Sequence, residues 1–266
     1  MSRSVSDLAL ALEVIAGPDE TRDGIAYRLA LPAARHKELK SFRVLVVDTH
    51  PLLPTAATVR TALDRLSQLL VKAGVKVGHE SPLLPDLAGS ARLFMRLLMP
   101  VFSARWPLEQ YKQAQAEAEA IKPDDQSLVA ERGRGVVLSH RDWIIADAAR
   151  TKLQQQWSEL FCEWDVVLCP PMATPAYPHD HSMPYSARHI EIDGKEYPYS
   201  DQLVWPEIAT TPGLPATAAP IGRSETGLPI GVQIVGPYLE DRTTIAFAEL
   251  IEREFGGFIP PPGYAD

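Results

Sequence analysis

The chain has 266 residues, of which 45% are hydrophobic and 23% charged, a balance typical of a globular protein with a substantial core. Its formal net charge of −8, with acidic and basic residues interspersed, argues against a nucleic-acid partner, which would need clustered lysine and arginine. The first residues do not resemble a secretory signal, no apolar run is long enough to cross a bilayer, and two cysteines give no disulfide framework, so we expect a cytoplasmic protein without membrane association.

The first part of the chain has the pattern of an amphipathic helix with an abrupt end. Apolar residues recur at helical spacing at Val5, Leu8, Leu12 and Ile15, and the glycine and proline at 17–18 would stop the helix.

A strand–helix–strand unit follows a connector over residues 19–40. Residues 42–48 form a continuous apolar run typical of a strand that is buried on both faces. Residues 55–73 carry an apolar helical stripe, and residues 75–78 suit a second short strand. Two strands joined through a helix indicate a parallel pair, and therefore an α/β architecture.

The middle of the chain is predominantly helical. Residues 82–163 show helical patterns throughout, and the last of these helices is a long one from about 139 to 163. A further buried strand is predicted at 165–170.

The last third begins with a proline-rich segment over 170–213, in which Asp193-Gly194 predicts a small hairpin. Short strands are expected at 216–219 and 231–235, and a final helix at 242–255. We expect residues 1–266 to form a single α/β domain.

Three groups of residues resemble motifs of the amidase signature family. Residues 1–9, Met-Ser-Arg-Ser-Val-Ser-Asp-Leu-Ala, are similar to the family's helix after its catalytic loop. Residues 164–171, Trp-Asp-Val-Val-Leu-Cys-Pro-Pro, are similar to a strand that ends in prolines. Gly-Leu-Pro-Ala at 213–216 precedes Gly-Leu-Pro-Ile-Gly-Val-Gln-Ile-Val-Gly at 227–236, as in that family. The three groups stand in family order over nearly the whole chain.

The resemblance implies the C-terminal portion of an amidase: a mixed or parallel sheet flanked by helices. The implied reaction is hydrolysis of a carboxamide to a carboxylate and ammonia or an amine. The family's nucleophilic serine, bridging serine and lysine precede the matching region, so the resemblance places no catalytic residue in this sequence. We therefore expect sheet completion and a substrate-pocket wall, no activity of the chain alone, no metal and no cofactor. The small-molecule amide would bind only together with the catalytic half.

Four residues are candidates for the substrate-pocket wall: Met172, Thr174, Trp205 and Thr210. They flank strand ends marked by prolines, where α/β proteins usually bind ligands, and the loops 170–176 and 205–213 are predicted to converge. Ordinary packing is the alternative for each of the four.

Other reactive side chains favour structural roles. His179, His181 and His189 lack the spacing of a metal site and fit a solvated loop. Cys162 and Cys169 fit small hydrophobic positions at a helix end and in a buried strand.

Two other functions stay open at this point. The first is a non-catalytic scaffold or binding module. The second is one half of a split amidase or of an amidotransferase A-like enzyme, with the serine on another chain. Edge strands and an apolar face left without a partner would also favour a homo-oligomer.

Overall fold

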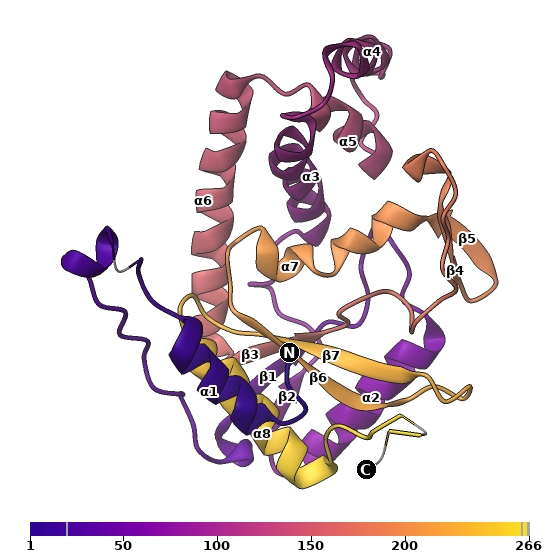
Figure 1. Ribbon diagram of the computed structural model, residues 1–266. Coiled ribbons are helices and arrows are strands. Elements are labelled where there is room, and N and C mark those ends of the chain that lie inside the picture. Colours follow the sequence, from indigo (N-terminus) through magenta and orange to yellow (C-terminus); the bar gives the residue numbers. More distant parts are fainter. Residues whose placement is uncertain (20, 262, 265–266) are drawn as a thin grey trace.

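The computed structural model describes residues 1–19, 21–261 and 263–264, and a five-stranded mixed sheet lies at its centre (Figure 1). The strand order is β2-β1-β3-β7-β6. β1 pairs in parallel with β2 and β3, whereas β7 is antiparallel to both β3 and β6. The strands are β1 (Arg43–Val46), β2 (Lys76–Gly78), β3 (Val166–Cys169), β6 (Ala216–Arg223) and β7 (Pro229–Val235). The prediction of a mixed sheet flanked by helices is confirmed.

The predicted strand–helix–strand unit is present as β1, α2 (Ala57–Lys72) and β2. The helix buries the apolar stripe that the sequence indicated, including Leu63 and Leu70. Gly74 lies just after the end of this helix and has a positive φ of 84°, which a residue with a side chain would disfavour. The amides of Gly74 and Val75 donate to the carbonyls of Val71 and Leu70, which is the bonding pattern of a Schellman cap. Local sequence therefore sets where α2 ends and where the chain turns toward β2.

Four helices form a layer on one side of the sheet, and the longest of them descends to the start of β3 (Figure 1). Their bounds are α3 (Leu87–Ser103), α4 (Leu108–Glu119), α5 (Leu128–Val136) and α6 (His140–Glu163). The side chain of Ser139 accepts a hydrogen bond from the Asp142 amide, as expected for the cap of a long helix. Trp157, Leu160 and Phe161 then bury the lower end of α6 against the sheet.

The helices α3 and α5 approach closely at Gly135, where a Cβ atom would lie 2.8 Å from the backbone oxygen of Met95. We expect Gly135→Ala to lower the free energy of unfolding by about 1–2 kcal/mol, because overpacking costs about 1–3 kcal/mol and the helix preference of alanine returns about 0.5–1 kcal/mol. Urea denaturation measures this difference.

Gly133→Ala is the matched control, because it lies in the same helix and its Cβ would meet only the movable end of the Ile121 side chain. This variant should gain up to about 1 kcal/mol from helix preference alone. Equal stability of the two variants would contradict the close approach at Gly135.

The first and last helices lie side by side against the sheet (Figure 1). α1 (Val5–Ile15) is capped by the Ser4 side chain, which accepts from the Asp7 amide, and α8 is Asp241–Phe255. The amide of Val5 donates to Oε2 of Glu252 over 2.9 Å, which joins the two helices. None of the residues of α1 is fully buried, in contrast to the apolar inner face of α8. The connector between α1 and β1 contains two short 3-10 turns, η1 (Asp23–Ile25) and η2 (Leu39–Ser41).

The proline-rich segment forms a separate two-stranded hairpin and a run of short helices. The hairpin is β4 (His189–Ile192) and β5 (Lys195–Pro198), and the short helices are η3 (Tyr185–Ala187), η4 (Tyr199–Val204) and α7 (Glu207–Thr210). Asp193 and Gly194 occupy the turn with φ of 50° and 80°, which confirms the predicted hairpin. Within the part of the chain that the structure describes, no helix combines the length and the apolar character needed to cross a bilayer.

Candidate functional site

The carboxyl end of β3 opens into two neighbouring pockets. They have volumes of about 620 Å³ and 450 Å³, and residues 174–180 line both of them. The hairpin and the β6–β7 turn form the other side of the larger pocket, while Arg188 and Tyr199 border the smaller one. This is the edge of the sheet at which the sequence placed the substrate pocket.

Met172 and Thr174 lie where the sequence predicted them, beside these pockets. Met172 lines the smaller pocket and Thr174 lines both, and each side chain is half-buried. The Thr174 hydroxyl donates to the carbonyl of Pro175 over 2.8 Å, so its oxygen keeps lone pairs for a further donor. Their role in substrate binding remains a prediction.

Trp205 and Thr210 lie elsewhere. Trp205 is 0% exposed and its ring packs edge-on against His50, with the centroids 5.7 Å apart. Burial lowers the pKa of His50 to about 4, so this imidazole is neutral at neutral pH. Thr210 is exposed on α7, and its hydroxyl donates to the carbonyl of Pro206. Neither residue lines the two pockets.

The predicted convergence of the two proline segments is only partly right. Cys169 and Ala218 both lie opposite Gln233 of β7, so β3 and β6 run in the same direction. Pro170 follows the carboxyl end of β3, whereas Pro215 precedes the amino end of β6. The two prolines therefore lie at opposite ends of the strands. The error arose because Pro170 follows its strand whereas Pro215 precedes its strand, and the two strands run in the same direction.

The first residue of the segment 205–213 nevertheless lies near β3. The Gln233 side-chain nitrogen lies 3.3 Å from the Trp205 carbonyl and 3.3 Å from Cys169 Sγ. The backbone of Trp205 therefore lies in the core beside β7, while Pro212 and Leu214 line a different pocket of about 660 Å³ beside the end of α6.

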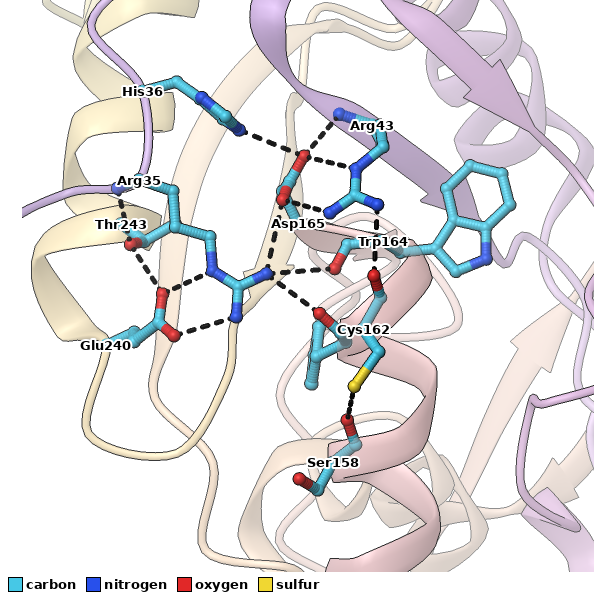
Figure 2. A network of polar contacts seen from close by, with 10 residues as sticks. Arg35, His36, Arg43, Ser158, Cys162, Trp164, Asp165, Glu240 and Thr243 are labelled. Carbon is cyan, nitrogen blue, oxygen red and sulfur yellow. Dashed lines mark hydrogen bonds and ion pairs between the residues drawn. The ribbon is translucent and has the colours of Figure 1, made fainter.

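A network of charges surrounds the opposite end of β3, as Figure 2 shows. Asp165 is 1% exposed, and it accepts from the backbone amide of Arg43 over 2.8 Å and from its guanidinium over 2.8 and 3.1 Å. Arg35 reaches Asp165 over 3.2 Å and also pairs with Glu240, and the His36 ring nitrogen lies 3.3 Å from the Asp165 carboxylate. These contacts join the connector, β1, β3 and the start of α8.

The arginines set the ionisation of Asp165. Burial alone would raise the pKa of this carboxyl, but the hydrogen bonds and charges of Arg43 and Arg35 outweigh it and lower the pKa to about 2. Glu240 and Asp165 neutralise the guanidinium of Arg35, which gives the network an architectural role.

The sequence reasoning missed this network and also a buried acid. Glu207 is 0% exposed at the start of α7, and burial raises its pKa to about 7. The only local pattern that indicates burial of this acid is its position among the apolar residues of 204–209. Contacts across 205 residues, such as that of Arg35 with Glu240, leave no local pattern.

Histidines and cysteines form no reactive cluster among the described residues. No group of three or more metal-ligating side chains is found there. The His179 and His181 rings lie 5.9 Å apart in the exposed loop. Cys169 is buried as expected, with a pKa raised to about 12 by burial, whereas Cys162 is exposed at the end of α6.

One serine–histidine pair was not foreseen. Ser67 of α2 and His79, just after β2, share a hydrogen bond of 3.2 Å. Ser67 is buried on the inner face of its helix, and neither residue lines the pockets described above. A nucleophile must face its substrate, so this pair serves packing.

Comparison with known proteins adds the following. Residues 1–245 match the family model described as Amidase. The A subunit of the glutamyl-tRNA(Gln) amidotransferase of Koribacter versatilis is 25% identical over an alignment of 275 positions, which covers 94% of this chain and 54% of that protein. Fatty-acid amide hydrolase 2-B of Danio rerio is also 25% identical, over 98% of this chain and 48% of its own length.

Solved structures agree on the fold. A bacterial aryl acylamidase of the amidase signature enzymes matches with a TM-score of 0.68 at 20% identity, over 96% of this chain and 52% of its own. The A subunit of the glutamyl-tRNA(Gln) amidotransferase of Thermotoga maritima matches with a TM-score of 0.67 at 18% identity, over 95% and 51%. The chain thus spans about half the length of the relatives that it matches.

Proposed function

The chain belongs to the amidase family, and we propose that it supplies the sheet and one pocket wall of a carboxamide hydrolase whose nucleophile comes from another polypeptide segment. This proposal rests on the family match over residues 1–245 together with the alignments to the relatives, which cover nearly all of this chain but about half of each relative. The pockets at the end of β3, with Met172 and Thr174 beside them, are the proposed wall.

The chemistry supports a dependence on a second segment. Amide hydrolysis needs an activated nucleophile, a base and oxyanion donors in one accessible place. Among the described residues, Ser67 contacts His79 and Ser90 contacts the Glu207 carboxyl, and both serines are buried. The substrate is a small carboxamide, bound only when the second segment completes the pocket.

We expect the isolated chain to release no ammonia or amine from simple aliphatic and aromatic amides. The measurement is an ammonia and amine assay on the purified protein, combined with mass spectrometry after a serine-directed fluorophosphonate probe. Ser67→Ala is the control variant and should behave as the unmodified chain. Turnover that accompanies a labelled serine on this chain would contradict the proposal.

Complementation is the positive test. The catalytic half of an amidase relative, ending just before the region that matches residue 1, is co-expressed with this chain. Recovered amide turnover that falls in Met172→Ala or Thr174→Ala supports the proposed wall. A stable complex whose turnover is insensitive to both variants would reject their role.

The edge of the sheet predicts self-association of the isolated chain. β6 is an edge strand of eight residues, and a pocket of about 430 Å³ lies between it and residues 1–5. An unpaired strand edge is a template for a second copy. We expect concentration-dependent dimers in sedimentation velocity.

Ala218→Lys, which places a charge at an exposed position of β6, should weaken the dimer. Thr226→Lys adds the same charge in the exposed β6–β7 turn and is the matched control. A monomer at all concentrations, or equal effects of the two variants, would remove β6 as the contact.

A further inference from the structure

The Glu207 carboxyl lies in the core between α7 and α3. Its side chain is fully buried at the first position of α7, a helix of four residues. Oε2 accepts from the hydroxyl of Ser90 on α3 over 2.8 Å and from that of Thr211, just after α7, over 2.7 Å. The carboxyl therefore joins both ends of the α7 turn to α3.

The second oxygen of this carboxyl is unsatisfied. Oε1 has no hydrogen-bond partner, and no ion pair involves Glu207 among the described residues. An ionised carboxylate without a cation costs more free energy in such a place than the neutral acid does.

The groups around Glu207 do not compensate its charge. The Cys169 thiol on β3 and the His50 imidazole beside Trp205 are both neutral near pH 7, because burial raises the pKa of the first to about 12 and lowers that of the second to about 4. On η4, Asp201 is paired with Arg132 of α5. At the start of α3, the side chain of Asp86 accepts from the Ala88 amide.

We propose that Glu207 is a pH-operated latch, which as a neutral acid holds α7 against α3 and which, on losing its proton, lets the segment 205–215 open. This segment carries Trp205 and leads into β6. Burial raises the pKa of Glu207 from its ordinary value of 4.5 to about 7, in the direction that the latch requires. The latch belongs to the fold of this chain and is independent of any hydrolytic activity.

The sign of the effect follows from proton linkage. In the open segment the carboxyl is solvated and ionises near its ordinary pKa of 4.5, whereas in the closed segment it ionises near 7. Between these values the closed state binds the additional proton, so the opening constant rises by up to about tenfold per pH unit. Below pH 4.5 and above pH 7 both states carry the same number of protons, so the opening constant does not change with pH.

Hydrogen exchange of the full chain measures this opening directly. The amides of Thr210, Thr211, Gly213 and Leu214 all donate to carbonyls of the same segment and report on it. After correction for the intrinsic exchange rate, their opening constant should rise steeply from pH 5 to 7 and then level. The amides of Gly74 and Val75 at the end of α2 should show no such rise.

Two variants separate the latch from general acid or base effects. Glu207→Gln keeps the shape without the titration and should abolish the pH dependence at these four amides. Thr211→Val removes a hydrogen bond that lowers the Glu207 pKa, so the rise should extend to higher pH, whereas Thr211→Ser keeps the hydroxyl and the original profile.

A flat opening constant in the unmodified chain between pH 5 and 7 would overturn the proposal. The same rise in Glu207→Gln would also overturn it, because another group would then be responsible. Loss of amidase complementation alone does not bear on the latch, since exchange is measured on this chain by itself.

Discussion

Replacing Asp165 with asparagine is expected to lower the free energy of unfolding by about 1.5–3 kcal/mol, because the charge-assisted hydrogen bonds of this carboxylate to Arg43 and Arg35 are lost while the two guanidinium groups stay partly solvated. Asp165 is buried at the start of β3 and satisfies Arg43 and Arg35 together. Asparagine retains one carbonyl acceptor but not the negative charge. Urea denaturation followed by circular dichroism gives the difference.

Glu38→Gln is the matched control, because it removes a carboxylate from an ion pair on the exposed surface with Lys40. Exposed ion pairs contribute little to stability, so this variant should have the same free energy of unfolding as the unmodified chain. If Asp165→Asn were as stable as the control, the network of Figure 2 would contribute no net stability.

The same residue predicts the response to acid. The folded pKa of Asp165 is lowered from its ordinary value of 3.8 to about 2. Its contribution is therefore complete above pH 3.8 and is lost as the pH falls through 2. The stability difference between the unmodified chain and Asp165→Asn should shrink over this range.

Trp205→Ala is expected to cost about 3–5 kcal/mol of unfolding free energy, the usual range for removing a buried tryptophan. The indole is fully buried and packs on His50. Met172→Ala, at a half-buried position beside a pocket, should cost less. This contrast distinguishes a packing residue from a pocket residue.

Trp205→Phe tests the same point more finely. The indole nitrogen is buried without a hydrogen-bond partner, so phenylalanine removes an unsatisfied donor together with part of the volume. Its cost should be clearly below that of alanine. Unfolding midpoints of Trp205→Ala that equal those of the unmodified chain would show that the ring is not part of the core.

Local patterns were sufficient for most elements. The apolar run before Asp48, the stripe of α2 and the cap at Gly74 are each contained within a few residues, so the sequence predicted them directly. Asp193-Gly194 predicted its hairpin because few other pairs adopt two successive positive φ angles.

Long-range pairing was beyond the sequence. The pairing of β3 with β7 joins residues more than 60 positions apart, so the sequence did not show that β3 and β6 run in the same direction and that Pro215 therefore lies at the opposite end of the sheet from Pro170. Of the four candidate site residues, Met172 and Thr174 lie beside pockets and remain predictions, whereas Trp205 lies in the core. A tryptophan beside proline turns suits a pocket wall and a core equally well.

The turn residue Asp193 has a second contact, and it affects how the chain folds. Its carboxylate accepts from the amide of Ala57 over 3.0 and 3.2 Å, at the first turn of α2, whose own cap position is an alanine without a side-chain hydrogen bond. The two residues are 136 positions apart. The start of α2 is therefore completed only after a long loop has closed, and the entropy of that closure falls on the folding barrier rather than on local helix formation. The first turn of α2 therefore gains this hydrogen bond only when the hairpin docks against it.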